Sequence, residues 1–170
     1  MIDQIVCALP KGREVEIIQI FGYTSRGIPG LEIVGLGQQG RAIKEKIVYI
    51  NKKLNLDIPN RRYLICIENE LIDTLSKSER RFLELPVWLL YLKLSGNIPI
   101  HGLRDVLSGG RLQIQGGIDC LNFKEDQIKS FNCKGLIPVV KKADFDQKVI
   151  ELPEIISHLR AKRAIGTANP

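Results

Sequence analysis

Two short runs near the start of the chain alternate apolar and polar residues, as half-buried strands do. They cover residues 2–8 and 15–20, and Leu9-Pro10-Lys11-Gly12 lies between them. Because proline and glycine favour turns, the pattern predicts a β-hairpin whose turn is formed by these four residues. A further apolar run at residues 31–34 predicts a third strand.

Apolar residues that recur every three or four positions predict an amphipathic helix after residue 40. The apolar positions are Ile43, Ile47, Ile50 and Leu54, whereas Arg41, Glu45 and Lys52 fall roughly opposite them. We expect this helix to lie on a sheet by its isoleucine face.

The most apolar part of the chain predicts a buried strand and a central helix. Residues 63–67 do not alternate, which is typical of a strand buried on both faces. Residues 82–94 would place apolar side chains, Trp88 among them, all around a helix, so this helix belongs in the centre of the fold. Proline is tolerated in the first turn of a helix, so Pro86 predicts a helix start near Glu84 or Leu85.

The remaining signals complete the predicted domain. Val106-Leu107 and residues 112–114 flank Ser108-Gly109-Gly110, which predicts a second hairpin. Short strands are expected at residues 136–140 and 148–152, and a closing helix at 154–161. Strands mixed with helices, without repeats or an internal linker, predict one α/β or α+β domain over residues 1–162, a mixed sheet with packed helices. Residues 163–170 are expected to be a loose tail.

Composition indicates a soluble, cytoplasmic protein. Of the 170 residues, 44% are hydrophobic and 26% are charged, as in ordinary globular domains. The longest apolar run, residues 85–92, is far shorter than the ~20 residues that cross a bilayer, so no membrane association is expected. The cysteines Cys7, Cys66, Cys120 and Cys133 form no CxxC pair, which indicates free thiols and no metal site.

The charge balance favours anionic partners without proving one. The net charge is +6, and basic residues cluster at several places, including Arg61-Arg62 and Arg80-Arg81. These four arginines are the candidate residues for binding an anion or a partner. A solvated surface is the alternative interpretation, because no aromatic residues are interleaved as in single-strand-binding proteins.

The glycines Gly35, Gly37 and Gly40 have the GxGxxG spacing of a dinucleotide-binding turn. That fold also needs an acidic residue at the end of the next strand, roughly 20 residues later, to bind the ribose. Asp57 instead precedes Ile58-Pro59 in an expected loop, and Glu68 comes too late. We therefore interpret the glycines as a structural turn and expect no cofactor.

Several blocks of the chain match, in order and nearly in spacing, the opening of one protein family. They are Pro29-Gly30-Leu31-Glu32-Ile33-Val34-Gly35-Leu36, Ala42-Ile43-Lys44-Glu45, Ile58-Pro59-Asn60-Arg61-Arg62, Phe82-Leu83-Glu84-Leu85-Pro86, Leu94-Ser95-Gly96-Asn97-Ile98-Pro99, residues 107–117 and Gly135-Leu136-Ile137-Pro138. In these blocks the chain resembles the magnesium-chelatase-like family of AAA+ ATPases, in particular its competence protein ComM branch. The resemblance implies a Lon-protease-like fold for this domain.

In Lon proteases this fold carries a serine nucleophile and a lysine base. The resemblance places the serine position on Arg80 or Arg81, and the lysine position on Asp119, at the start of a helix after the predicted hairpin. Neither arginine nor aspartate can fill these roles. Ser78 beside Lys77 remains a formal dyad, but adjacent residues project in different directions. The phosphate-binding string GxxxxGK[ST] of the family's motor is absent as well, so no enzymatic activity is expected.

The sequence thus predicts a non-catalytic interaction or regulatory domain, related to ComM and connected with DNA uptake or recombination. Its expected partner is DNA, an ATPase ring or another protein, and its oligomeric state is open. A residual serine hydrolase or peptidase is the alternative.

Overall fold

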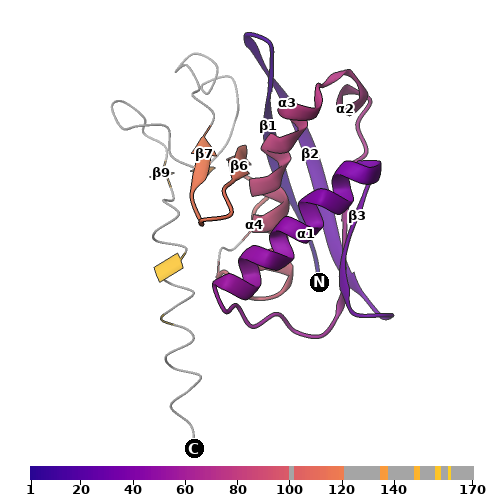
Figure 1. The fold of residues 1–170 in the computed structure, drawn as a ribbon, viewed down its shortest axis with the longest axis vertical. Helices are drawn as coiled ribbons and strands as arrows, with labels where there is room; N and C mark the ends of the chain where they lie inside the picture. The colour runs from indigo at the N-terminus through magenta and orange to yellow at the C-terminus, as the bar shows by residue number, and fades with distance from the viewer. Residues whose placement is uncertain (100–101, 121–134, 138–147, 150–155, 158–160, 162–170) are drawn as a thin grey trace, which may run out of the picture.

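A seven-stranded mixed sheet organises the residues that the computed structural model describes, which are 1–99, 102–120, 135–137, 148–149, 156–157 and 161 (Figure 1). Its strand order is β3 (Gly30–Val34), β4 (Arg62–Cys66), β2 (Glu14–Ser25), β1 (Ile2–Lys11), β5 (Val106–Ser108), β8 (Gly135–Ile137) and β9 (Lys148–Val149). Strand β2 runs antiparallel to β1 and β4, and the other neighbours are parallel. Helices pack on this sheet, which confirms the predicted α/β (α+β) class.

The first hairpin is confirmed, but the predicted turn is wrong. Lys11 pairs with Glu14, so only Gly12 and Arg13 form the turn, and Pro10 belongs to β1 opposite Val15. Leu9 is completely buried, so the core extends the strand beyond the residues whose types favour a turn. Gly12 has a φ of 61°, a left-handed conformation that glycine adopts without steric cost.

Helix α1 (Gly37–Lys53) follows β3 and has the predicted isoleucine face. Ile43, Ile47 and Ile50 are buried, whereas Arg41, Glu45 and Lys52 are exposed. The helix runs diagonally across the molecule and contacts both β3 and the central helix (Figure 1). Two short helices, α2 (Leu71–Thr74) and α3 (Lys77–Arg80), and a 3-10 turn, η1 (Arg81–Leu83), lead from β4 to that central helix.

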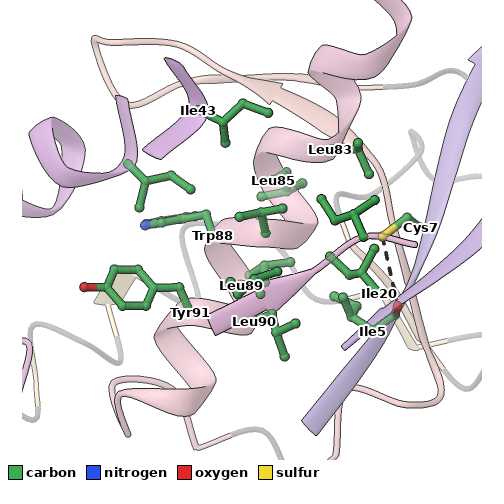
Figure 2. Close-up of a cluster of buried hydrophobic side chains, with 14 of the residues drawn as sticks. Ile5, Cys7, Ile20, Ile43, Leu83, Leu85, Trp88, Leu89, Leu90 and Tyr91 are labelled. Atoms are coloured by element: carbon green, nitrogen blue, oxygen red, sulfur yellow. Dashed lines mark hydrogen bonds between the residues drawn. The ribbon is translucent and has the colours of Figure 1, made fainter. Parts of the chain in front are cut away.

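The central helix is α4 (Glu84–Leu94), and it starts where Pro86 predicts. Lys93 is the one residue of α4 that is not buried. Figure 2 shows the hairpin side chains of Ile5, Cys7 and Ile20 on one side of this helix and Ile43 of α1 on another. Strand β4 is buried from Tyr63 to Cys66, as its lack of alternation predicts. The core therefore lies between the sheet and α4.

The second predicted hairpin is wrong. Strand β5 does not pair with β6 (Gly110–Leu112); it lies between β1 and β8 in the main sheet, parallel to both. All three residues of β5 are buried, which suits an interior strand. Strand β6 instead pairs with β7 (Ile118–Cys120), and Gln113 closes their loop by donating its N–H to the Gly117 carbonyl at 2.9 Å.

The last predicted elements fall mostly outside the described residues. Strand β8 overlaps the expected strand at 136–140, and β9 lies within the expected strand at 148–152. Residues 156–157 and 161 of the expected closing helix are helical. The expected tail at 163–170 is not described. Where the structure describes the chain, no helix has both the length and the apolar character needed to cross a membrane.

Candidate functional site

The four candidate arginines form two pairs at opposite ends of the sheet. Arg62 begins β4 opposite Ser25, the last residue of β2. Gly12 lies just before the start of β2, at the other end of this strand. Its N–H donates to the Glu79 carboxylate at 3.1 Å, and Arg80 is the next residue after Glu79. Strand β2 has 12 residues, so these two ends lie about 35 Å apart at ~3.4 Å per residue. The structure does not bring the pairs together.

Three of these arginines are already engaged within the chain. Arg62 Nη2 lies 2.7 Å from Glu32 Oε2, and Arg80 Nε donates to the Leu75 carbonyl at 3.0 Å. Arg81 Nε donates to Glu84 Oε1 at 3.1 Å. A partner that used these guanidinium groups would have to share or replace their present contacts.

Glu84 is the centre of a buried polar network that sequence reasoning did not identify. Its side chain lies at the first residue of α4 and the residue is only 2% exposed. One carboxylate oxygen accepts hydrogen bonds from Lys46 Nζ at 2.6 Å and from Arg81, and the other accepts from the Leu112 N–H at 2.9 Å. An acid at a helix N-terminus is also favoured by the helix dipole. The available signal was a glutamate inside an otherwise apolar segment.

The network joins three parts of the fold. Lys46 comes from α1, Arg81 from η1 and Leu112 from β6, and Lys46 Nζ also donates to the Leu112 carbonyl at 3.3 Å. Each donor thereby compensates the buried carboxylate, as a buried charge requires. We interpret Glu84 as the group that holds β6 against the start of the central helix.

Asp119 lies in β7, so the expectation that it begins a helix is wrong. Its carboxylate accepts a hydrogen bond from Gln113 Nε2 at 2.6 Å and lies 3.2 Å from Arg111 Nη2. The Arg111 guanidinium stands 5.3 Å from the centre of the Phe82 ring, a cation–π distance. The resemblance places the serine position on Arg80 or Arg81 and the lysine position on Asp119. Each of these residues is engaged within the chain, Arg80 with the Leu75 carbonyl, Arg81 with Glu84 and Asp119 with Arg111 and Gln113.

Ser78 lies on the exposed surface of α3. The helix begins with a capping box, in which Ser76 Oγ accepts from the Glu79 N–H at 3.2 Å and Glu79 Oε2 accepts from the Ser76 N–H at 2.7 Å. The bond from the Ser76 N–H lowers the pKa of Glu79 most, and the bond from Gly12 lowers it further. Glu79 thus stabilises the start of α3, and Arg80 and Arg81 come directly after it in the chain.

Close backbone packing explains why glycine occupies two positions of the glycine turn. Gly35 has a φ of 100°, and a Cβ there would lie 1.9 Å from the Ile67 carbonyl oxygen. A Cβ on Gly40 would lie 3.3 Å from the Ile33 carbonyl oxygen, so this glycine lets α1 approach β3 closely. Backbone packing therefore accounts for both residues without a nucleotide.

Metal-binding and reactive-thiol chemistry have little support in the described part of the chain. There, no three His, Cys, Asp or Glu side chains are grouped so that they could hold a metal ion. Cys7 and Cys66 are free and buried, and burial raises the pKa of each thiol, which disfavours the reactive thiolate.

No protein-family model matches the chain, and no curated protein is significantly similar to it.

Proposed function

We propose that this chain is a non-catalytic interaction or regulatory domain, related to the ComM and magnesium-chelatase-like ATPases and connected through such an ATPase with DNA uptake or recombination. The observation that supports it is the state of Asp119 and of Arg80 and Arg81, one of which would stand at the serine position. Arg80 bonds to the Leu75 carbonyl, Arg81 pairs with Glu84, and Asp119 pairs with Arg111 and Gln113, so none of these positions offers a nucleophile or a free base.

A protein partner is better supported than direct DNA binding. A phosphate-binding surface requires several cations on one face. Arg62 lies opposite the last residue of β2, whereas Glu79, next to Arg80, binds Gly12 just before its first residue, and this 12-residue strand is about 35 Å long at ~3.4 Å per residue. Three of the four are also engaged within the chain. We therefore expect the chain to act on a ring-forming ATPase rather than to hold DNA by itself.

The proposal is tested with the purified chain and an AAA+ ATPase module of the magnesium-chelatase-like family that lacks its own N-terminal domain. We expect the chain to co-elute with the ATPase in size-exclusion chromatography and to change its rate of ATP hydrolysis. An unrelated protein of similar size and net charge is the control. Absence of both effects would refute the proposed partnership.

The hydrolase alternative is tested with a serine-reactive phosphonate. We expect no labelling of the wild-type chain, because Ser78 is exposed and consecutive residues of a helix, such as Lys77 and Ser78, do not face each other. Labelling that disappears in Ser78→Ala would instead favour a peptidase or esterase activity.

A further inference from the structure

The main sheet has two faces, and the core with α4 covers one of them. Ile5 and Ile20 point toward α4 (Figure 2), and Leu31 and Ile65 belong to the same core cluster. Side chains of a strand alternate between its two faces, so the residues next to these along β1–β4 point to the opposite face, here called the outer face. Its side chains include Ile2, Gln4 and Val6 of β1, Ile17, Gln19, Phe21 and Tyr23 of β2, Glu32 and Val34 of β3, and Arg62, Leu64 and Cys66 of β4.

Apolar side chains form two neighbouring rows across the outer face. The register of the strands gives the rows Val34–Cys66–Phe21 and Leu64–Tyr23–Ile2. Ile2 is 81% exposed, Phe21 41% and Val34 40%. Single exposed apolar side chains are ordinary, but a contiguous group of them on a sheet marks a surface for binding another molecule.

Strand β4 is apolar on both faces, although the core covers only one of them. Tyr63 and Ile65 lie in the core cluster, whereas Leu64 and Cys66 alternate with them and are buried on the outer face. A strand that is apolar on both faces is typical of a sheet that is covered on both sides. The outer face therefore has the composition of a surface that packs against another sheet or helix.

The outer face is electrically balanced, whereas the whole chain is basic. Among the outer-face side chains named above, Glu32 and Arg62 carry charge, and they pair with each other at 2.7 Å. The net charge of the chain is +6. A nucleic acid or a strongly charged peptide would find no excess of opposite charge here, whereas the same face of a second copy is apolar and equally balanced. Charge complementarity therefore favours a second copy of this chain as the occupant.

The size of the outer face is suited to a weak interface. Four strands span about 20 Å at ~4.8 Å from strand to strand, and the rows from Ile2 to Val6 with their neighbours span about 20 Å along the strands. The resulting area of about 400 Å² is that of the largest apolar patch on a typical monomer. It is about half of the ~800 Å² that each partner buries in a standard interface, so a dimer through this face should have a Kd of roughly 10 to 100 μM.

We propose that the outer faces of two copies pack against each other and form a sheet-on-sheet dimer, which covers Ile2, Phe21 and Val34. The two sheets would lie about 10 Å apart, as packed sheets do. Gln4 and Gln19 can hydrogen-bond across such an interface, because a glutamine side chain is both donor and acceptor. The proposal goes beyond the proposed function and needs no ATPase. It is tested on the chain alone, so the two proposals fail separately.

Sedimentation velocity of the full chain, at concentrations from about 1 μM to about 500 μM, tests for the dimer. We expect a monomer at the lowest concentration and mostly dimer at the highest. Added salt should leave the dimer intact or strengthen it, because the interface has no net charge and salt screens the repulsion between two basic chains.

Phe21→Lys identifies the surface, with Tyr49→Lys as the matched control. Both aromatic side chains are exposed, at 41% and 51%, and both changes add one positive charge, but Tyr49 lies on α1, on the core side of the sheet. Phe21→Lys should weaken the dimer at least about tenfold, because it places an ammonium group in an apolar interface. Tyr49→Lys should weaken it less than about threefold.

Val34→Ser is a second variant that adds no charge. It removes apolar area from both copies and should weaken the dimer at least about threefold. Circular dichroism checks that all three variants fold, and the salt dependence of the wild-type dimer needs no variant.

Three results would overturn the proposal. The first is a chain that stays monomeric at every concentration, which would leave the outer face for a different protein. The second is a dimer that added salt dissociates, because its interface would then consist of charges. The third is equal weakening by Phe21→Lys and Tyr49→Lys, which would place the interface elsewhere.

Discussion

The Lys46 ammonium lies 2.6 Å from the Glu84 carboxylate, and this pair connects α1 with the first residue of the central helix. The two residues are 38 positions apart in the chain. Because the same carboxylate also holds the Leu112 N–H, one buried acid fixes the relative positions of α1, α4 and β6. Arg81 bonds to the same carboxylate, so this buried acid has a structural role.

Glu84→Gln tests this role, because glutamine keeps an acceptor for the Leu112 N–H but removes the charge that Lys46 and Arg81 compensate. We expect the free energy of unfolding to fall by about 3 kcal/mol, the low end for breaking a buried pair, since Arg81 remains partly exposed. Urea unfolding followed by circular dichroism measures it. The control Glu45→Gln, at an exposed site of α1, should change stability by less than about 0.5 kcal/mol. Equal midpoints for the two variants would contradict the structural role.

Gly35→Ala tests whether the glycine turn is steric in origin. The added Cβ would meet the Ile67 carbonyl oxygen, and the backbone there is left-handed. We expect a loss of at least about 3 kcal/mol in thermal or urea unfolding. Gly37→Ala is the matched control, because its Cβ would meet nothing within 4 Å and should cost only about 1 kcal/mol for the left-handed backbone. Neither variant nor the wild type should bind ATP; micromolar binding lost in Gly37→Val would show that the turn is a nucleotide site.

Stability should depend on pH through Glu79. Hydrogen bonds from Ser76 and Gly12 lower its pKa in the folded chain, so it binds protons more weakly folded than unfolded. Its stabilisation is therefore present above the ordinary pKa of glutamate and is lost as the pH falls through the lower, folded value. Thermal unfolding between pH 6 and pH 3 should show a smaller acid-induced decrease of the midpoint in Glu79→Gln than in the wild type. Parallel curves for the two proteins would rule out this contribution.

DNA binding, if present, should be weak and sequence-independent, because the arginine pairs lie at opposite ends of β2. Each phosphate contact changes the slope of log K against log salt by about −0.9 on duplex DNA. We expect a slope that corresponds to no more than about two contacts. Anisotropy with a labelled duplex and a single strand, for wild type, Arg61→Glu and Arg80→Glu, measures it. A steep slope that both variants flatten would indicate one continuous surface and would reverse our preference for a protein partner.

Local sequence patterns determined the two longest helices and the inner strand of this protein, but they did not indicate α2 or α3. Helix α1 follows from the spacing of Ile43, Ile47 and Ile50, and α4 from a continuous apolar run with Pro86 in its first turn. These signals depend on which side chains lie within one or two turns of each other, so they are visible without knowledge of the rest of the chain.

Only the tertiary structure decided which strands pair and which charges meet. Ser108-Gly109-Gly110 has the composition of a hairpin turn. Strand β5 nevertheless pairs with β1 and β8 in the main sheet, because it is buried between them. The contacts of Glu84 with Lys46 and Leu112 span 38 and 28 positions, and no local pattern indicates them. The separation of Arg61-Arg62 from Arg80-Arg81 is likewise set by the length and direction of β2. Pairing across the sheet and compensation of buried charge depend on residues far apart in the chain, which periodicity and residue type do not bring together.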